Sequence, residues 1–228
     1  MNVFILFPHQ TFLCIADDLL KLIFSRSVFT KLRDKTTSAK DFIFNADLIA
    51  NYLSLHILNH LDYSTKFVET KTGSRFQGIE QVKEVIAVSI GRGSSPLETA
   101  MRTAFPHQIH VGKLLIHKGD NKIGTPRLFF SHFPDACLKR ENRVVLVDTT
   151  LASANVAIMA VRVLLDHDVE EKSIIFACII ASPEGVSNLL RVFPQITIVV
   201  AAIDQGLDEN FHVIPGLGSF GDRYSNTS

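Results

Sequence analysis

Short, continuously apolar runs alternate with longer segments of helical periodicity between residues 85 and 203. Apolar runs without polar interruption are typical of strands buried on both faces, and helices of this length can connect parallel strands. The sequence therefore predicts an α/β fold with a mostly parallel central sheet flanked by helices. The predicted strands are VIAVSI, VGKLLIH, RVVLVD, SIIFACIIA and ITIVVAAI, and the predicted helices are SPLETAMRTAF, ASANVAIMAVRVLLDH and PEGVSNLLRVF.

A long helix and a hairpin arm are predicted upstream of these runs. Apolar residues recur at spacings of three and four in SAKDFIFNADLIANYLSLHILNHL, with Thr37 or Ser38 as the N-cap. The segment FVETKTGSRFQG then predicts a β-arm hairpin with Thr72 and Gly73 at its turn. A chain of 228 residues with 46% hydrophobic content can bury one large core. We therefore expect one α/β domain over residues 32–228, preceded by an N-terminal extension over residues 1–31.

The extension begins with MNVFILFPHQTFLCIADDLLKLIFS, which is apolar enough to raise the question of a signal peptide or a membrane anchor. It lacks a basic start, Pro8 and His9 interrupt it, and Asp17, Asp18 and Lys21 break any continuous apolar span. We expect instead an amphipathic helix that packs on the domain or at a subunit contact, and no membrane partner.

The charge balance and the cysteine pattern limit which partners and which cellular location are expected for the protein. Lysine plus arginine and aspartate plus glutamate both number 23, so no net field draws the chain to nucleic acid. Cys14, Cys137 and Cys178 form no C-x-x-C pair, and the nine histidines show no metal spacing. A disulfide framework or a protein-held metal is therefore not expected, and a reducing cytoplasm, with the nucleus as the alternative, is the predicted location.

Three predicted strands end in residues that could bind a ligand, because open parallel sheets bind ligands at the carboxyl ends of their strands. Asp148 ends RVVLVD and precedes a loop of small residues and a helix, an arrangement that binds ribose hydroxyls and phosphate. Its alternative role is to cap the next turn. Arg92, between Gly91 and Gly93, either contacts a pyrophosphate or lies in a flexible surface turn. Lys118 belongs either to the same site or to a solvated charged loop.

The C-terminal stretch PGLGSFGDRY holds Gly216, Gly218 and Gly221 in the G-x-G-x-x-G spacing of dinucleotide-binding loops. That loop works only between a strand and a helix, and here only seven residues follow Gly221, without a predicted helix. The spacing is therefore not a dinucleotide fingerprint. Glycines beside Pro215 predict a sharp turn with accessible main-chain amides, which either binds a flat polar ligand or only reverses the chain.

Together these segments resemble the uracil phosphoribosyltransferases, especially those of eukaryotic type, from Leu32 to Tyr224. AIDQGLDENFHVIPGLGSFGDRY is similar to the uracil-binding loop of that family, and IASPEGVSNLLRVFP to the segment before it. VETKTGSRFQG resembles the arm of the family. The resemblance implies a type I phosphoribosyltransferase fold and the transfer of phosphoribosyl from phosphoribosyl pyrophosphate to uracil, giving UMP and pyrophosphate in pyrimidine salvage. Positioning and charge stabilisation dominate such a reaction.

The resemblance also implies partners and site residues. Mg²⁺ would enter bound to the pyrophosphate donor, a homodimer or higher homo-oligomer is expected, and GTP is a candidate effector. Asp148 matches the acid that binds the ribose hydroxyls, Arg92 an arginine on the pyrophosphate side, and these two are the predicted catalytic residues. The predicted donor-binding residues are Arg92, Lys118, Asp148, Thr149, Thr150, Leu151, Ala152, Ser153, Ala154, Asn155, Val156 and Ser219. The predicted uracil-binding residues, acting largely through main-chain atoms, are Val213, Gly218, Ser219 and Phe220.

The donor loop departs from the family pattern. It reads DTTLASANV, so Ala154 and Asn155 replace two glycines and Val156 removes a hydroxyl. Lys118 replaces an arginine, and Ser219 replaces an aspartate. Two functions therefore remain open at this point. One is a working uracil phosphoribosyltransferase, a pentosyltransferase. The other is a catalytically impaired relative that binds a pyrimidine or UMP and acts as a regulatory or partner subunit.

Overall fold

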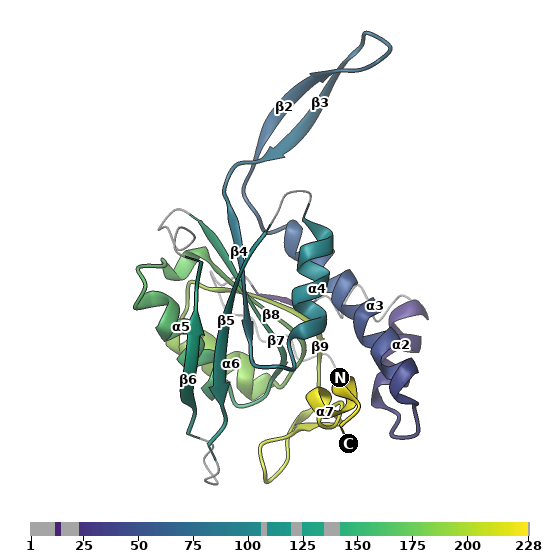
Figure 1. Cartoon of the computed structure of the whole chain (residues 1–228), viewed down its shortest axis with the longest axis vertical. Coiled ribbons are helices and arrows are strands. Elements are labelled where there is room, and N and C mark those ends of the chain that lie inside the picture. The colour runs from purple at the N-terminus through teal and green to yellow at the C-terminus, as the bar shows by residue number, and fades with distance from the viewer. Residues whose placement is uncertain (1–11, 15–22, 106–108, 120–124, 135–141, 228) are drawn as a thin grey trace.

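The computed structural model describes residues 12–14, 23–105, 109–119, 125–134 and 142–227 (Figure 1). Its centre is a seven-stranded sheet in the order β1-β9-β8-β7-β4-β5-β6. All neighbouring strands pair in parallel except β6, which is antiparallel to β5. The strands are β1 (Phe12–Cys14), β4 (Val85–Ile90), β5 (His110–His117), β6 (Arg127–His132), β7 (Arg143–Leu151), β8 (Ile174–Ala181) and β9 (Thr197–Ile203).

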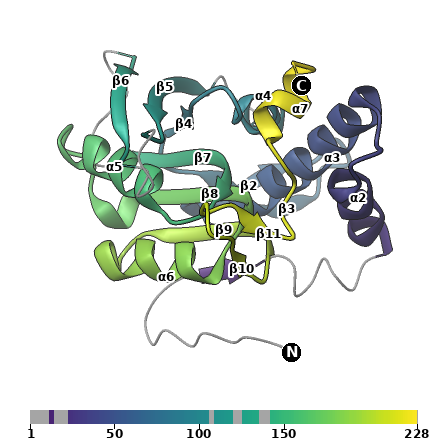
Figure 2. The ribbon, with the colours of Figure 1, turned by 90° about the horizontal axis from the view of Figure 1, so that it is seen from below.

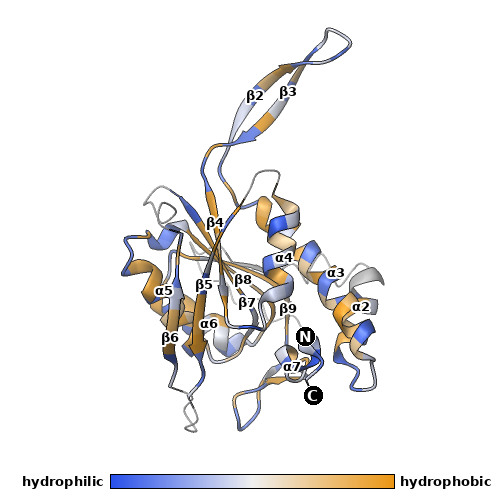
Figure 3. Ribbon diagram, viewed as in Figure 1, coloured by the Kyte–Doolittle hydropathy of each residue, from blue (hydrophilic) through white to orange (hydrophobic). Residues whose placement is uncertain are grey.

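Helices cover both faces of this sheet (Figure 2). Alternate residues of each central strand enter opposite cores: Val145 and Val147 pack with one set of helices, and Val144 and Leu146 pack with the other. This is why the central strands are apolar throughout, as the colouring of Figure 3 shows. The first core includes α2 (Ile23–Arg33), α3 (Ala39–Leu58), α4 (Ser95–Ala104) and α7 (Phe220–Ser225), and the second includes α5 (Asn155–Leu165) and α6 (Pro183–Val192).

The predicted arm is an antiparallel hairpin of β2 (Tyr63–Glu69) and β3 (Arg75–Gln81) that projects away from the body (Figure 1). Gly73 turns the chain with φ +77°, so the predicted turn is confirmed. Large apolar side chains of the arm are exposed, among them Phe76 at 59% and Ile79 at 69%. The arm therefore adds little to either core.

Most predicted elements are confirmed within one to three residues. Ser38 caps α3, because its side chain accepts a hydrogen bond from the Asp41 amide. The amphipathic helix expected over the first 25 residues is wrong at residues 12–14, which form β1. That strand pairs with the otherwise uncovered edge of β9 and so satisfies its main-chain groups. Residues 1–11 and 15–22 lie outside the described residues.

Two further differences concern element ends. The boundary expected between residues 31 and 32 falls inside α2, whose Val28, Phe29 and Leu32 are buried in the first core. A short helix, α7, begins at Phe220 and includes Gly221, where no helix is predicted. In the part of the chain that the structure describes, no helix has the length and apolar character needed to span a membrane.

Candidate active site

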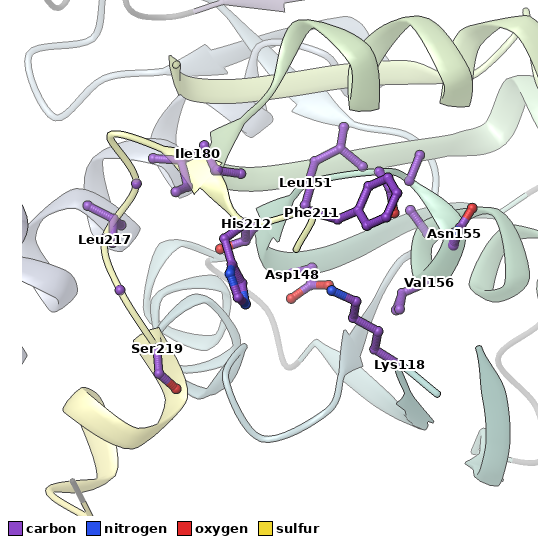
Figure 4. A pocket seen from close by; sticks show the side chains of 18 of the residues that line it. Lys118, Asp148, Leu151, Asn155, Val156, Ile180, Phe211, His212, Leu217 and Ser219 are labelled. Carbon is purple, nitrogen blue, oxygen red and sulfur yellow. The ribbon is translucent and has the colours of Figure 1, made fainter. Parts of the chain in front are cut away.

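A cavity of about 660 Å³ lies at the carboxyl ends of the central strands (Figure 4). The loop between β7 and α5 forms one side of it, and the chain that follows β11 (Val213–Ile214) forms another. Asp148 lies between the two (Figure 4). The segments predicted separately for a donor and for a base thus line one cavity, as the ligand rule for open parallel sheets requires.

The β7–α5 loop directs its main-chain amides into the cavity. The carbonyl oxygens of Leu151 and Ala152 accept hydrogen bonds from the Ser182 amide and hydroxyl, at 2.9 and 2.7 Å, and the Ser153 carbonyl accepts one from Asn188 at 3.3 Å. Ser182 is the N-cap of α6, and Asn188 lies within that helix. In a trans peptide the N–H points away from the C=O. The amides of the next residues, Ala152, Ser153 and Ala154, therefore point away from α6, and all three residues line the cavity.

The N-terminus of α5 completes this side of the cavity. Ala154 is the N-cap in the left-handed conformation, with φ +73°, and no side chain caps the helix. The amides of a first helical turn have no partner within the helix and carry the positive end of its dipole. Asn155, Val156 and Ala157 belong to that turn and line the cavity. Together with the loop amides they form a cradle suited to a phosphate.

Asp148 supplies the carboxylate of the cavity. Burial raises its pKa from the ordinary value of 3.8 to about 7, and hydrogen bonds from the amides of Thr149 and Thr150 oppose the rise. The Thr149 amide donates to Asp148 Oδ1 at 2.7 Å. The carboxylate thus caps the following turn, as its alternative role predicts, and also faces the cavity. A partly desolvated carboxylate of this kind strengthens any hydrogen bond that it accepts from a ligand hydroxyl.

The chain after β11 forms a second set of cavity-facing amides. The Gly216 carbonyl accepts a hydrogen bond from Arg33 at 3.0 Å, and the Leu217 carbonyl accepts one from Arg223 at 2.8 Å. By the same peptide geometry, the amides of Leu217 and Gly218 point the other way, and both residues line the cavity. Gly216 and Gly218 have φ of +66° and +71°, which favours glycine at both positions.

A buried ion pair fixes this loop. Asp204 follows β9, and its side chain is 2% exposed. It accepts hydrogen bonds from both terminal nitrogens of Arg33 and from the Gly216 amide, the last at 2.8 Å. Arg33 thus binds Asp204 and the Gly216 carbonyl together. Nothing in the sequence pattern links Asp204 to an arginine 171 positions away.

Two predicted donor residues line the cavity but already have partners. The Lys118 ammonium donates to the Asn210 carbonyl at 3.0 Å. The Ser219 hydroxyl donates to Asp222 at 2.5 Å, one turn along α7.

Three predicted site residues do not line the cavity. Arg92 is exposed in the turn after β4. Thr149 is buried with its hydroxyl against Gly93, where a Cβ would lie 3.3 Å from the oxygen. The Phe220 ring packs in the first core against Phe42, at 5.2 Å between centroids, so only its main chain remains for a ligand. Thr150 and Val213 do line it.

The cavity also has residues that sequence reasoning missed. Phe211 and His212 come from the turn between β10 (Gly206–Leu207) and β11, and Ile180 comes from the end of β8. Ile180 belongs to a fully apolar strand, so its position at a strand end was the only available indication. Phe211 and His212 lie inside the segment that resembles the uracil-binding loop, but their side chains were not predicted to line the cavity, because they enter it through the turn geometry.

This arrangement suits a ligand with an anion at one end, a hydroxylated middle and a flat group with carbonyl acceptors at the other end. The cradle of α5 fits the anion, Asp148 accepts from hydroxyls, and the Leu217 and Gly218 amides donate to carbonyls. Among the described residues, no group of three or more His, Cys, Asp or Glu side chains could hold a metal ion. Of the described residues that line the cavity, Asp148 is the one with a carboxylate.

Comparisons with known proteins agree with this geometry. A family model described as uracil phosphoribosyltransferase matches residues 22–227. The chain is 38% identical over 197 residues to a uracil phosphoribosyltransferase of Saccharomyces cerevisiae, which covers 86% of this chain and 89% of that protein. It is 39% identical over 203 residues to uridine kinase-like protein 3 of Arabidopsis thaliana, covering 89% of this chain but spanning only 42% of the relative. In fold it is similar to the AQ2163 protein of Aquifex aeolicus, with a TM-score of 0.80, 24% identity, and coverage of 96% and 99% of the two chains.

Proposed function

The chain belongs to the uracil phosphoribosyltransferase family, and from this premise we propose that it transfers phosphoribosyl from phosphoribosyl pyrophosphate to uracil, forming UMP and releasing pyrophosphate. The observation that carries the proposal is that one shared cavity has main-chain amides at both ends and Asp148 between them. Relatives that match over most of their length are described as uracil phosphoribosyltransferases, which favours an enzyme over a non-catalytic subunit.

On this proposal the donor occupies the α5 side of the cavity. The amides of Ala152, Ser153 and Ala154 would bind the 5′-phosphate, and Asp148 would accept hydrogen bonds from the ribose hydroxyls. Positive charge develops on the ribose as pyrophosphate leaves, so a carboxylate beside the sugar lowers the barrier, provided that it is ionised. The side-chain departures in the loop do not remove these main-chain donors.

Uracil would occupy the other side, where the Leu217 and Gly218 amides meet its carbonyl oxygens. Cytosine presents an amino donor in place of one carbonyl, which would leave a main-chain donor unpaired. Discrimination of this kind reaches several orders of magnitude when the unpaired group is buried. We therefore propose uracil over cytosine as the base.

We propose that Mg²⁺ enters with the donor, bound to its pyrophosphate, where it would supply neutralisation of the leaving group. Asp148 is the cavity carboxylate that fits the hydration shell of such an ion. Arg92 and Lys118 stay proposed pyrophosphate contacts, and the first would have to turn in from its exposed position. A homo-oligomer, GTP as an effector and a cytoplasmic location are further parts of the proposal, supported by the family resemblance and by cysteine usage.

The direct test is turnover. Purified protein with uracil, phosphoribosyl pyrophosphate and Mg²⁺ is expected to release pyrophosphate and form UMP, and cytosine is expected to react at least ~100-fold more slowly. A heat-treated sample is the control. If the protein binds UMP but converts no pyrimidine base, the proposal of an enzyme is contradicted and the non-catalytic alternative remains.

A further inference from the structure

Phe211 and Lys118 meet in the cavity although they come from different elements. Lys118 follows β5, and Phe211 lies in the turn between β10 and β11. The Lys118 ammonium lies 5.9 Å from the centroid of the Phe211 ring and donates to the carbonyl of the preceding residue, Asn210, at 3.0 Å. A cation over an aromatic face and a hydrogen bond to the main chain together join the two elements.

The turn that carries Phe211 is held in a costly conformation. Phe211 has φ +61°, which is uncommon for a bulky residue. Asp208 stabilises this conformation, because one of its carboxylate oxygens accepts from the amides of Asn210 and His212, both at 2.8 Å. The Asp208 main chain also bonds His212 and Phe211, at 2.8 and 3.0 Å. The ring is thus positioned by its turn, and Phe211 as a whole residue is 39% exposed.

We propose that Phe211 and Lys118 form a latch at the donor side of the cavity, closed in the ligand-free protein, so that Phe211 sets the affinity for the phosphoribosyl donor. In Figure 4 the ring points toward the side formed by Leu151 and Asn155. The proposed pyrophosphate contact, Lys118, is bound instead to Asn210. The inference rests on the proposed function, since it concerns the same donor.

Donor binding therefore has to open the latch. When only a fraction of the protein is open, the apparent dissociation constant is the intrinsic one divided by that fraction. An open fraction of roughly one tenth would weaken donor binding about tenfold. Removing the ring removes this cost without altering the phosphate cradle.

Calorimetry with Mg²⁺ and phosphoribosyl pyrophosphate, without a base, tests the ring. Phe211→Gly and Phe211→Ala are both expected to bind about tenfold more tightly than the unchanged protein. Asp168→Gly is the matched control, because Asp168 also has a positive φ, +62°, but lies in an exposed turn after α5. Equal or weaker binding by both Phe211 variants would overturn the latch. So would a gain in Phe211→Gly alone, which would trace the effect to the backbone.

Hydrogen exchange of the ligand-free protein tests the contact itself. Lys118→Met is expected to speed exchange of the amides of residues 208–212 several-fold, because the bond to Asn210 is lost. Unchanged exchange would overturn the latch. This measurement needs no donor, so it decides the latch even if the donor binds to none of the variants, a result that would contradict the proposed function instead.

Discussion

Asp148 is placed where ligand binding and folding make opposite demands. Its pKa is about 7 in the folded protein and 3.8 ordinarily. The folded chain therefore binds more protons between these values, so the contribution of this group to the free energy of unfolding falls as pH rises from about 4 to about 7, and then levels off. A ligand that offers hydroxyl donors would favour the ionised form and recover part of this cost.

Replacing Asp148 with asparagine is expected to stabilise the ligand-free protein at about pH 8 by roughly 1–3 kcal/mol. The full difference in pKa would give ~4 kcal/mol at 1.36 kcal/mol for each pKa unit, and solvent in the cavity reduces it. The gain should shrink toward zero near pH 4. Urea unfolding over this range measures it, with the exposed Asp166→Asn as the control. A gain that is independent of pH would contradict the assigned cause.

Ala154 and Asn155, which replace two family glycines, differ in backbone conformation. Ala154 alone has a positive φ, and Asn155 begins α5. A left-handed alanine costs roughly 1–2 kcal/mol. The loop accepts that cost, because its carbonyls are bound to α6 and the Ala154 methyl is buried in the second core.

Ala154→Gly is therefore expected to change the free energy of unfolding by less than ~1 kcal/mol, since relief of strain is offset by the lost methyl and by the flexibility of glycine. Donor affinity should change less than about threefold, because the alanine already adopts the required conformation. Asn155→Gly should not improve donor binding either. Calorimetry on both variants measures this, and a tenfold tighter complex would show that the departure from glycine had distorted the loop.

At the scale of elements, the conformation of the loop after β11, which carries the amides proposed to bind uracil, depends on a helix far away in sequence. Arg33 ends α2 and binds Asp204 and Gly216, so the helix fixes the loop whose amides face the cavity. Breaking a buried pair leaves an uncompensated charge, which commonly costs ~3–5 kcal/mol. The Arg33 side chain is 26% exposed, which moderates this value.

Arg33→Met is expected to lower the free energy of unfolding by roughly 2–3 kcal/mol and to weaken UMP binding, because the Gly216 carbonyl and Asp204 lose their partner. Adding Asp204→Asn should recover part of the stability, since no buried charge is then left unpaired. Arg26→Met, an exposed position on the same helix, is the control. Denaturant unfolding and UMP calorimetry measure the two effects. Full stability in the single variant would contradict a structural role for the pair.

The elements were predictable where one physical cause dominated. β4, β7, β8 and β9 are buried along nearly their whole length, so their apolar runs marked them directly, and β5 was marked by the apolar residues of its buried face. β6 was missed because RLFFSH is exposed at every residue and forms only by pairing with β5. β1 was missed because its three residues become a strand only at the edge of β9. Both depend on a partner distant in sequence, which local periodicity does not contain.

The site was predictable to a similar extent. Strand ends and the glycine turn identified the two sides of the cavity, and Asp148 between them. The orientation of the amides was not predictable, because it depends largely on bonds from Ser182 and Arg33 to carbonyls 30 and 183 positions away in the chain. Phe211 reaches the cavity through a turn in which it has a positive φ, a conformation that the preferences of phenylalanine do not predict.

At the scale of the whole molecule, a single chain leaves the apolar side chains of the β2–β3 arm exposed to solvent. A two-stranded hairpin is at best marginally stable in water, and this one exposes apolar side chains on both of its faces. The register places Tyr63, Phe67 and Ile79 on one face and Val68 and Phe76 on the other. Contiguous exposed apolar surface marks interaction sites, so the arm is the natural contact for the proposed homo-oligomer.

Phe67→Ser with Ile79→Ser should therefore shift the protein toward smaller species in sedimentation velocity. The two residues share a face of the arm and contribute to neither core, so the fold of the body should persist. Circular dichroism checks that persistence. Phe44→Ser, an exposed aromatic on α3, is the matched control and should leave the sedimentation coefficient unchanged. If the double variant sediments like the unchanged protein, the arm does not carry the subunit contact.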